Sequence, residues 1–216
     1  MENTQKIQKF WDNQAKRFDQ ADKQFEAVYK LVFARLDKYL NPNDTILDYG
    51  CATGIKTIEF AKKVQHVHGL DISSEMIKEA IKKKDGSKIN NISFTQGTIF
   101  SADFEKSSFD KVIAFGIIHL LEEKEKAVQR IKELLKPGGL FISTTACMRD
   151  KMDFKTRLKV STVICMKKLG MFPLHLNLFK SKDVEKLFID QNFEIVESEK
   201  LDKGIPAVFI IAKKKL

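Results

Sequence analysis

The stretch ILDYGCATG, residues 46–54, joins a short apolar run to a turn of small residues. The apolar run predicts a buried β-strand, and Gly50, Ala52 and Gly54 leave room for a ligand to approach the backbone. The helix expected after the turn would offer unpaired N–H groups to that ligand. The stretch therefore predicts a strand–turn–helix unit of an α/β sheet, with a ligand at the carboxyl end of the strand.

The same rhythm continues along the chain. The apolar runs VHGLD, ISFT, FDKVIAF and GLFISTT alternate with helical stretches, one of which is expected from about Glu122 to Lys136. This pattern predicts a doubly wound, mostly parallel α/β sheet with helices on both faces. A helix over 181–190 and strands over 193–198 and 207–213 follow, and these strands can pair antiparallel at an edge. The expectation is seven strands, preceded by two extra N-terminal helices.

The composition is that of one soluble domain. The 216 residues are 43% hydrophobic and 31% charged, without internal repeat or linker, so we expect a single domain over 1–216. No run approaches about 18 consecutive apolar residues, and the N-terminus MENTQKIQKFWDNQ lacks the apolar core of a signal peptide, so a cytoplasmic location is expected. Three cysteines without a C-x-x-C pair predict free thiols and no metal site.

The net charge of +9 is concentrated in one interval. Between Cys147 and Lys182, nine basic residues and two acidic ones leave +7, together with four of the six methionines. Three interpretations stay open: contact with an apolar or anionic substrate or a membrane surface, contact with nucleic acid, or an amphipathic helix with a solvated basic face. Against nucleic acid, 33 of the 38 basic residues are Lys, whereas Arg is the residue that binds phosphate bidentately. The lysines expected to affect substrate affinity are Lys151, Lys155, Lys159, Lys167 and Lys168.

A second polar position follows the next strand. Asp71 ends the run VHGLD, 23 residues after Asp48, where a carboxylate can accept hydrogen bonds from both hydroxyls of a ribose. The alternative is that Asp71 or Ser73 caps the following helix. A dinucleotide fingerprint G-x-G-x-x-G starting at Gly50 would require glycines at 52 and 55, where alanine and isoleucine stand. Hydride transfer with a nicotinamide cofactor is therefore not expected.

Five stretches, in order and spacing, resemble the successive motifs of the class I S-adenosylmethionine-dependent methyltransferases: ILDYGCATG, GLDIS, TQGTIF, FDKVIAFGIIHLL and LLKPGGLFIS. The N-terminal FWDNQAKRFD and the tail SKDVEKLFIDQNFEIVE further resemble the small-molecule branch typified by the ubiquinone and menaquinone biosynthesis methyltransferases. The resemblance implies a Rossmann-like fold, with S-adenosylmethionine as cofactor and S-adenosylhomocysteine as product. It also implies an N-terminal helical lid over 1–40 and a helical substrate cover over 147–180.

The resemblance assigns roles to individual residues. The implied cofactor contacts are Gly50, Ala52, Gly54 and Phe115 at the methionine part, Asp48 at its amino group, Asp71 at the ribose, and Ile72, Thr98 and Ile99 at the adenine. Two positions depart from the family pattern, since Ala52 replaces the commonest glycine and Thr98 replaces an aspartate. In the N-terminal helix, Phe18 would be a lid aromatic and Arg17 a contact to the cofactor carboxylate. The alternative is that Phe18 belongs to the apolar stripe of a docked helix.

Methyl transfer by in-line displacement needs a base only when the acceptor must lose a proton. His119, four residues beyond Phe115, is the predicted catalytic base, and the alternative is a packing role in the turn GIIHLL. The expected function is methyl transfer to an apolar or anionic small molecule. Two alternatives remain. One is methylation of tRNA or another nucleic acid, although no Asn-Pro-Pro-Tyr motif follows FDKVIAF; the other is a non-catalytic protein that binds the cofactor.

Overall fold

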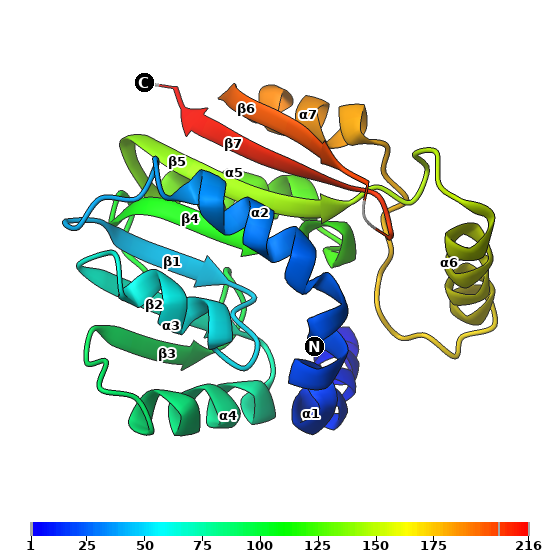
Figure 1. Cartoon of the computed structure of the whole chain (residues 1–216), viewed down its shortest axis with the longest axis horizontal. Coiled ribbons are helices and arrows are strands. Elements are labelled where there is room, and N and C mark those ends of the chain that lie inside the picture. The colour runs from blue at the N-terminus through cyan, green and yellow to red at the C-terminus, as the bar shows by residue number, and fades with distance from the viewer. Residues whose placement is uncertain (1, 203, 216) are drawn as a thin grey trace.

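A computed structural model describes residues 2–202 and 204–215, with a seven-stranded sheet at its centre (Figure 1). The strand order is β3-β2-β1-β4-β5-β7-β6, and only β7 runs antiparallel to its neighbours. This topology confirms the doubly wound, Rossmann-like sheet. The antiparallel strand lies one place inside the edge, because β6 pairs on its outer side. The strands are β1 (Thr45–Tyr49), β2 (His66–Asp71), β3 (Ile92–Gln96), β4 (Phe109–Phe115), β5 (Leu135–Ala146), β6 (Phe193–Leu201) and β7 (Ala207–Lys214).

Both faces of the sheet are covered, because its central strands carry apolar side chains at consecutive positions. In β4, Val112 packs in the core on one face and Ile113 in the core on the other. Helices α5 and α7 cover the first face, and α2 and α3 cover the second. The helices are α1 (Glu2–Asp22), α2 (Glu26–Leu36), α3 (Ile55–Ala61), α4 (Ser74–Asp85), α5 (Lys124–Leu134), α6 (Phe154–Lys168) and α7 (Ser181–Asp190), with short 3-10 turns η1 (Lys23–Phe25) and η2 (Ile118–Leu120). In the described part of the chain, no helix is long and apolar enough to cross a membrane.

Helix α1 lies beside α4 at the carboxyl ends of the strands (Figure 1). Asp12 of α1 accepts hydrogen bonds from the Ser73 hydroxyl at 2.6 Å and from the Glu75 N–H at 3.1 Å. Asp22, at the end of α1, pairs with Lys56 of α3 at 2.6 Å. These contacts hold α1 over the strand ends, whereas α2 returns to the sheet. Within the predicted lid over 1–40, α1 lies over the strand ends, and Phe25, Val28 and Tyr29 from η1 and α2 line the same cavity.

Helix α6 stands away from the rest of the molecule (Figure 1). Of its 15 residues, Thr156 and Val160 are the buried ones. Asp153 caps the helix by accepting a hydrogen bond from the Thr156 N–H at 3.0 Å. The interval 147–180 thus contains the expected helix, but most of this helix faces solvent.

The boundary between α5 and β5 differs from the expectation. The helix expected to reach Lys136 ends at Leu134, and β5 begins at Leu135, which pairs with Phe109 of β4. Pro137 explains the early end, because the residue before a proline is disfavoured in the helical conformation. The strand that enters the site is therefore longer than the run GLFISTT suggested.

Candidate active site

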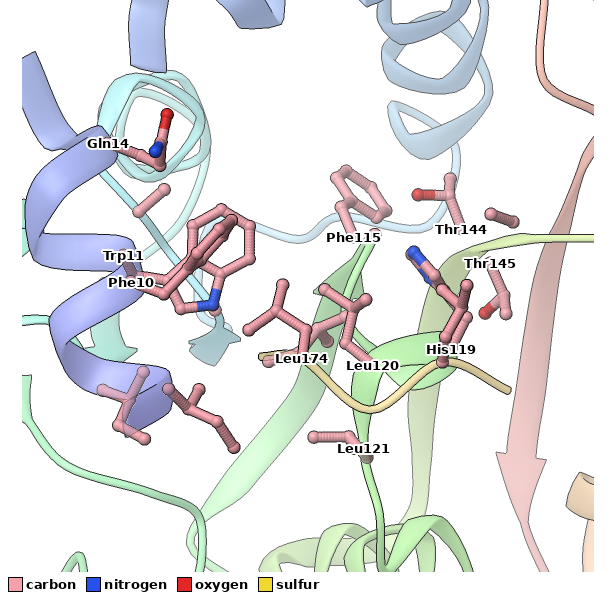
Figure 2. A pocket seen from close by; sticks show the side chains of 18 of the residues that line it. Phe10, Trp11, Gln14, Phe115, His119, Leu120, Leu121, Thr144, Thr145 and Leu174 are labelled. Carbon is pink, nitrogen blue, oxygen red and sulfur yellow. The ribbon is translucent and has the colours of Figure 1, made fainter. Parts of the chain in front are cut away.

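A cavity of about 1110 Å³ lies at the carboxyl ends of the central strands (Figure 2). Its walls come from the strand ends, from α1, from α6 and from the segment that follows α6. Phe10 of α1 and Phe172 of that segment meet edge to face, with ring centroids 5.6 Å apart. Pockets for one small ligand usually measure roughly 300–1,000 Å³, so this cavity has room for a cofactor and a second molecule.

The turn after β1 brings backbone to the cavity wall. Gly50 and Gly54 have φ values of +79° and +77°, which favour glycine. A Cβ on Gly50 would lie 2.9 Å from the Cδ1 atom of Ile117, and one on Gly54 would lie 2.8 Å from the Cβ atom of Ala80. Glycine is therefore required at both positions. Ala52 lies between them with φ of +47°, so its methyl group is held in a left-handed conformation.

We expect Ala52→Gly to raise the free energy of unfolding by about 1 kcal/mol, because glycine adopts a left-handed φ without steric conflict. Urea denaturation monitored by circular dichroism measures the change. The matched control is Ala34→Gly in the exposed part of α2, where the same substitution should lower the free energy of unfolding by about 1 kcal/mol. A loss of stability in both variants would contradict the strain at Ala52.

Asp71 ends β2 with its carboxylate on the cavity wall. One oxygen accepts a hydrogen bond from the Ala52 N–H at 2.9 Å, and the other accepts from the Ser73 N–H at 2.9 Å. Ser73 caps α4 with its own hydroxyl, which accepts from the Met76 N–H at 3.1 Å, so Asp71 is not the cap. A carboxylate has about four acceptor sites, and two remain for a ligand. Burial raises the pKa of the Asp71 carboxyl to about 6.

Three predicted contact residues do not line the cavity. Asp48 is buried beneath the turn, where its carboxylate accepts a hydrogen bond from the Thr57 hydroxyl at 2.6 Å, and burial raises its pKa to about 6. The side chain of Ile99 is fully buried in the core on the α5 face. Gly54 packs against α4. These residues support the cavity wall from behind.

The other predicted cofactor contacts lie on the wall, including both residues from α1. Phe18 contacts Trp11 edge to face, with centroids 6.3 Å apart, so the apolar stripe of α1 faces the cavity rather than the sheet. Thr98 uses its hydroxyl within its own turn, where it accepts from the Ser101 N–H at 3.1 Å. The predicted contacts that line the cavity are Arg17, Phe18, Gly50, Ala52, Asp71, Ile72, Thr98 and Phe115.

His119 lies in η2 on the wall of the cavity (Figure 2). Its Nδ1 atom is buried and has no hydrogen-bond partner among the described residues, and the same is true of the Thr145 hydroxyl on the same wall. Burial lowers the pKa of His119 to about 4. The imidazole is therefore neutral at pH 7 and free to accept a proton or a hydrogen bond.

Asn177 holds the segment after α6 onto the His119 turn. Its backbone N–H donates to the His119 carbonyl at 2.8 Å, and its side-chain amide donates to the Leu121 carbonyl at 2.7 Å. Sequence reasoning missed Asn177, because nothing in the local pattern reveals a contact to a turn 58 residues away. It also missed Thr145, which was visible as a polar residue at the end of the strand run GLFISTT.

The doubly wound sheet and the cavity at its strand ends define a Rossmann-like ligand-binding domain. Residues 40–201 match the family described as methyltransferase domain. The chain belongs to this family, and its fold is that of the class I S-adenosylmethionine-dependent methyltransferases.

Among curated proteins, the chain is 36% identical over 110 residues to an uncharacterised methyltransferase of Schizosaccharomyces pombe, which covers 47% of this chain. It is 32% identical over 126 residues, 57% of this chain, to the phosphoethanolamine N-methyltransferase of Plasmodium falciparum. The chain spans less than half of each relative, 40% and 47% of their lengths. A solved methyltransferase in complex with the Haloferax volcanii Trm112 activator has the same fold, with a TM-score of 0.73 at 16% identity over 95% of this chain and 98% of that one.

Proposed function

We propose that this protein transfers a methyl group from S-adenosylmethionine to an uncharged, largely apolar small molecule. The observation that carries the proposal is one cavity whose lining joins a glycine turn and a carboxylate to many aliphatic and aromatic side chains. We call the part of the lining that contains the glycine turn and the Asp71 carboxylate the cofactor end, and the part that contains the aliphatic side chains of α6 and of the segment after it the acceptor end. The reaction class in this proposal rests on the family, and the apolar nature of the acceptor rests on the lining of the cavity.

The residues at the cofactor end suit S-adenosylmethionine. Gly50 provides backbone without a side chain, Asp71 has acceptor sites for the ribose hydroxyls, and Ile72 offers an apolar surface for the adenine. Arg17 lies on the same wall with a charge that complements a carboxylate. When bound, this cofactor supplies an electrophilic methyl group, so the protein must mainly position an acceptor behind it.

The acceptor end of the cavity suits an apolar acceptor. Among the described residues at this end, Lys159 is the one lysine or arginine on the wall, and the other four lysines of the sequence hypothesis do not line the cavity. A phosphate group would require several converging cationic or N–H donors. The acceptor is therefore unlike the phosphoethanolamine named for the Plasmodium relative. Apolar residues at this end are Met148, Val160, Val163, Leu174, Leu176 and Ile205.

His119 gives this end its proton acceptor. A neutral imidazole with an unpartnered Nδ1 can take a proton from an acceptor hydroxyl, enol or amine as the new bond to the methyl group forms. The Thr145 hydroxyl, also unpartnered, can hold the acceptor by a hydrogen bond. The resemblance of the chain ends to quinone-biosynthesis methyltransferases agrees with an acceptor that is apolar apart from such a group.

The proposal predicts transfer of label into an organic-soluble product. Purified protein, supplied with methyl-labelled S-adenosylmethionine and a solvent extract of cells, should release S-adenosylhomocysteine, and the label should partition into the organic phase. The Asp71→Ala variant is the matched control and should leave the label in the donor. Saturable binding of S-adenosylmethionine without release would indicate a non-catalytic binding protein. Label in the tRNA fraction would favour the nucleic-acid alternative.

A further inference from the structure

The side of α6 that faces solvent and the turn after it are strongly apolar, although they are exposed. Phe154 is 78% exposed, Leu158 61%, Leu169 68% and Met171 65%. The next most exposed large apolar side chain among the described residues is Ile189 at 54%. A cluster of this kind marks an interaction surface more often than an ordinary solvated helix. We call it the outer surface of α6.

The helical geometry separates this surface from the cavity. Thr156 and Val160 are buried, and Val163 lines the cavity, so these residues mark the inner side of α6. At 3.6 residues per turn, Phe154 and Leu158 lie about 160° around the helix from Thr156. The inner side of α6 therefore faces the acceptor end of the cavity, and its outer surface faces the solvent.

Uncompensated positive charge surrounds the outer surface. The single acidic residue between Lys151 and Met171 is Asp153, whose carboxylate is used by Thr156 at the helix cap. None of the basic residues in this interval forms an ion pair with a described carboxylate, whereas exposed lysines elsewhere, such as Lys30 and Lys78, do. The unpaired basic residues are Lys151, Lys155, Arg157, Lys159, Lys167 and Lys168. Of these, Lys155, Arg157 and Lys168 flank the outer surface, whereas Lys159 lines the cavity and Lys167 lies on the inner side of the helix.

We propose that the outer surface of α6 docks the protein onto an anionic membrane surface. The apolar side chains enter the headgroup region, and the surrounding cations contact the anionic headgroups. A nucleic acid would use the cations but leave Phe154, Leu158, Leu169 and Met171 in water. Docking in this orientation brings the acceptor end of the cavity close to the bilayer, where apolar molecules are dissolved. The proposal concerns the surface alone and holds whether or not the protein transfers methyl groups.

Vesicle binding tests the charge contribution. The full chain should co-sediment with phosphatidylcholine vesicles that contain phosphatidylglycerol, more weakly at high salt, and should not co-sediment with phosphatidylcholine alone. The combined variant Lys155→Gln, Arg157→Gln, Lys168→Gln should bind on the order of 100-fold more weakly. The control variant Lys30→Gln, Lys78→Gln, Lys126→Gln loses the same charge from other exposed positions and should retain binding within about threefold. Equal losses in both variants would overturn the proposal, because net charge alone would then explain binding.

A fluorescent label tests the orientation. Cys165 is exposed and shares the outer side of α6 with Phe154, whereas Cys51 and Cys147 are buried, so a thiol-reactive, polarity-sensitive dye should label Cys165 alone. Phosphatidylglycerol vesicles should shift its emission to the blue. Phe154→Ser with Leu158→Ser should abolish this shift, and Ile189→Ser with Val196→Ser should not. An unshifted label in the presence of bound vesicles, or binding of tRNA in place of vesicles, would overturn the proposal.

Discussion

The Asp71→Ala variant is expected to bind S-adenosylmethionine at least about 100-fold more weakly than the wild type, as measured by isothermal titration calorimetry. A hydrogen bond to a charged group contributes about 1.5–3 kcal/mol, and a ribose offers two hydroxyls to the carboxylate. Each 1.4 kcal/mol corresponds to about tenfold in Kd. Loss of both contacts is therefore expected to cost at least about 3 kcal/mol, which corresponds to the 100-fold loss of affinity.

Asp71 also holds the backbone of Ala52 and Ser73, so lost loop structure must be separated from lost ribose contact. A thermodynamic cycle, in which the wild type and Asp71→Ala each bind S-adenosylhomocysteine and its 2′-deoxy analogue, separates these two effects. The wild type should discriminate between the two ligands by about tenfold or more, and Asp71→Ala should bind them equally. Ser73→Ala, which removes the α4 cap, should keep the discrimination. Equal discrimination in wild type and Asp71→Ala would refute the ribose assignment.

The pH dependence of binding provides an independent check on the same carboxylate. Burial raises the pKa of Asp71 to about 6, so the charged form is present above this pH and is lost below it. If the ribose binds the carboxylate, affinity should fall by up to about tenfold per pH unit below pH 6. Asp48 titrates in the same range, and the difference between wild type and Asp71→Ala isolates the contribution of Asp71.

The His119→Ala variant is expected to lose about 10² to 10⁴ of the turnover rate while its Kd for S-adenosylmethionine stays unchanged. The imidazole has an unpartnered Nδ1 on the cavity wall, and no predicted cofactor contact depends on it. Because burial lowers its pKa to about 4, the neutral form persists through pH 5. The wild-type rate should therefore show no break near pH 6.5 caused by His119. Single-turnover assays across pH 5–8 measure the loss of rate and its pH dependence, and calorimetry measures the Kd.

A matched histidine tests whether the loss is specific. His66 is hydrogen-bonded to the Ser93 hydroxyl at 2.8 Å on β2, away from the cavity lining, and His66→Ala should retain turnover. Circular dichroism of both variants checks that the fold is kept. Unchanged turnover in His119→Ala would assign His119 to packing in the η2 turn. A parallel loss of cofactor affinity would instead indicate that the wall of the cavity has collapsed.

The part of the cavity proposed to hold the cofactor could be located from sequence, because its signals are local. A strand followed by small residues, and a strand that ends in aspartate, each point to the carboxyl edge of a parallel sheet. Gly50, Asp71 and Phe115, which are predicted cofactor contacts, lie at that edge and line the cavity. Asp48 and Ile99, which were also predicted as cofactor contacts, do not line the cavity. Closeness to a turn in sequence does not say whether a side chain points into the ligand space or beneath it.

The acceptor end was harder to predict from sequence, because it is built from segments that are remote in sequence. Lys159 could not be distinguished from its neighbouring lysines until the inner side of α6 was known. The role of Asn177 depends on the path of the chain after α6, which places its N–H groups against the carbonyls of His119 and Leu121. Loops and partly exposed helices have little periodic signal of their own, so their contacts depend on the surfaces against which they pack.

By itself, the sequence determined the doubly wound sheet, the glycine turn after β1 and the interval that carries most of the positive charge. The alternation of strand and helix patterns and the conformational freedom of glycine are local properties of a few residues. They therefore do not depend on how distant segments pack. Only the tertiary structure decided which of these charges meet the cavity: of the five proposed substrate lysines, Lys159 alone lines it, whereas Lys155 and Lys168 lie on the flanks of α6. A helix exposes a different residue every 100°, and its docking angle, set by long-range contacts, selects which residues meet the ligand and which meet the surroundings.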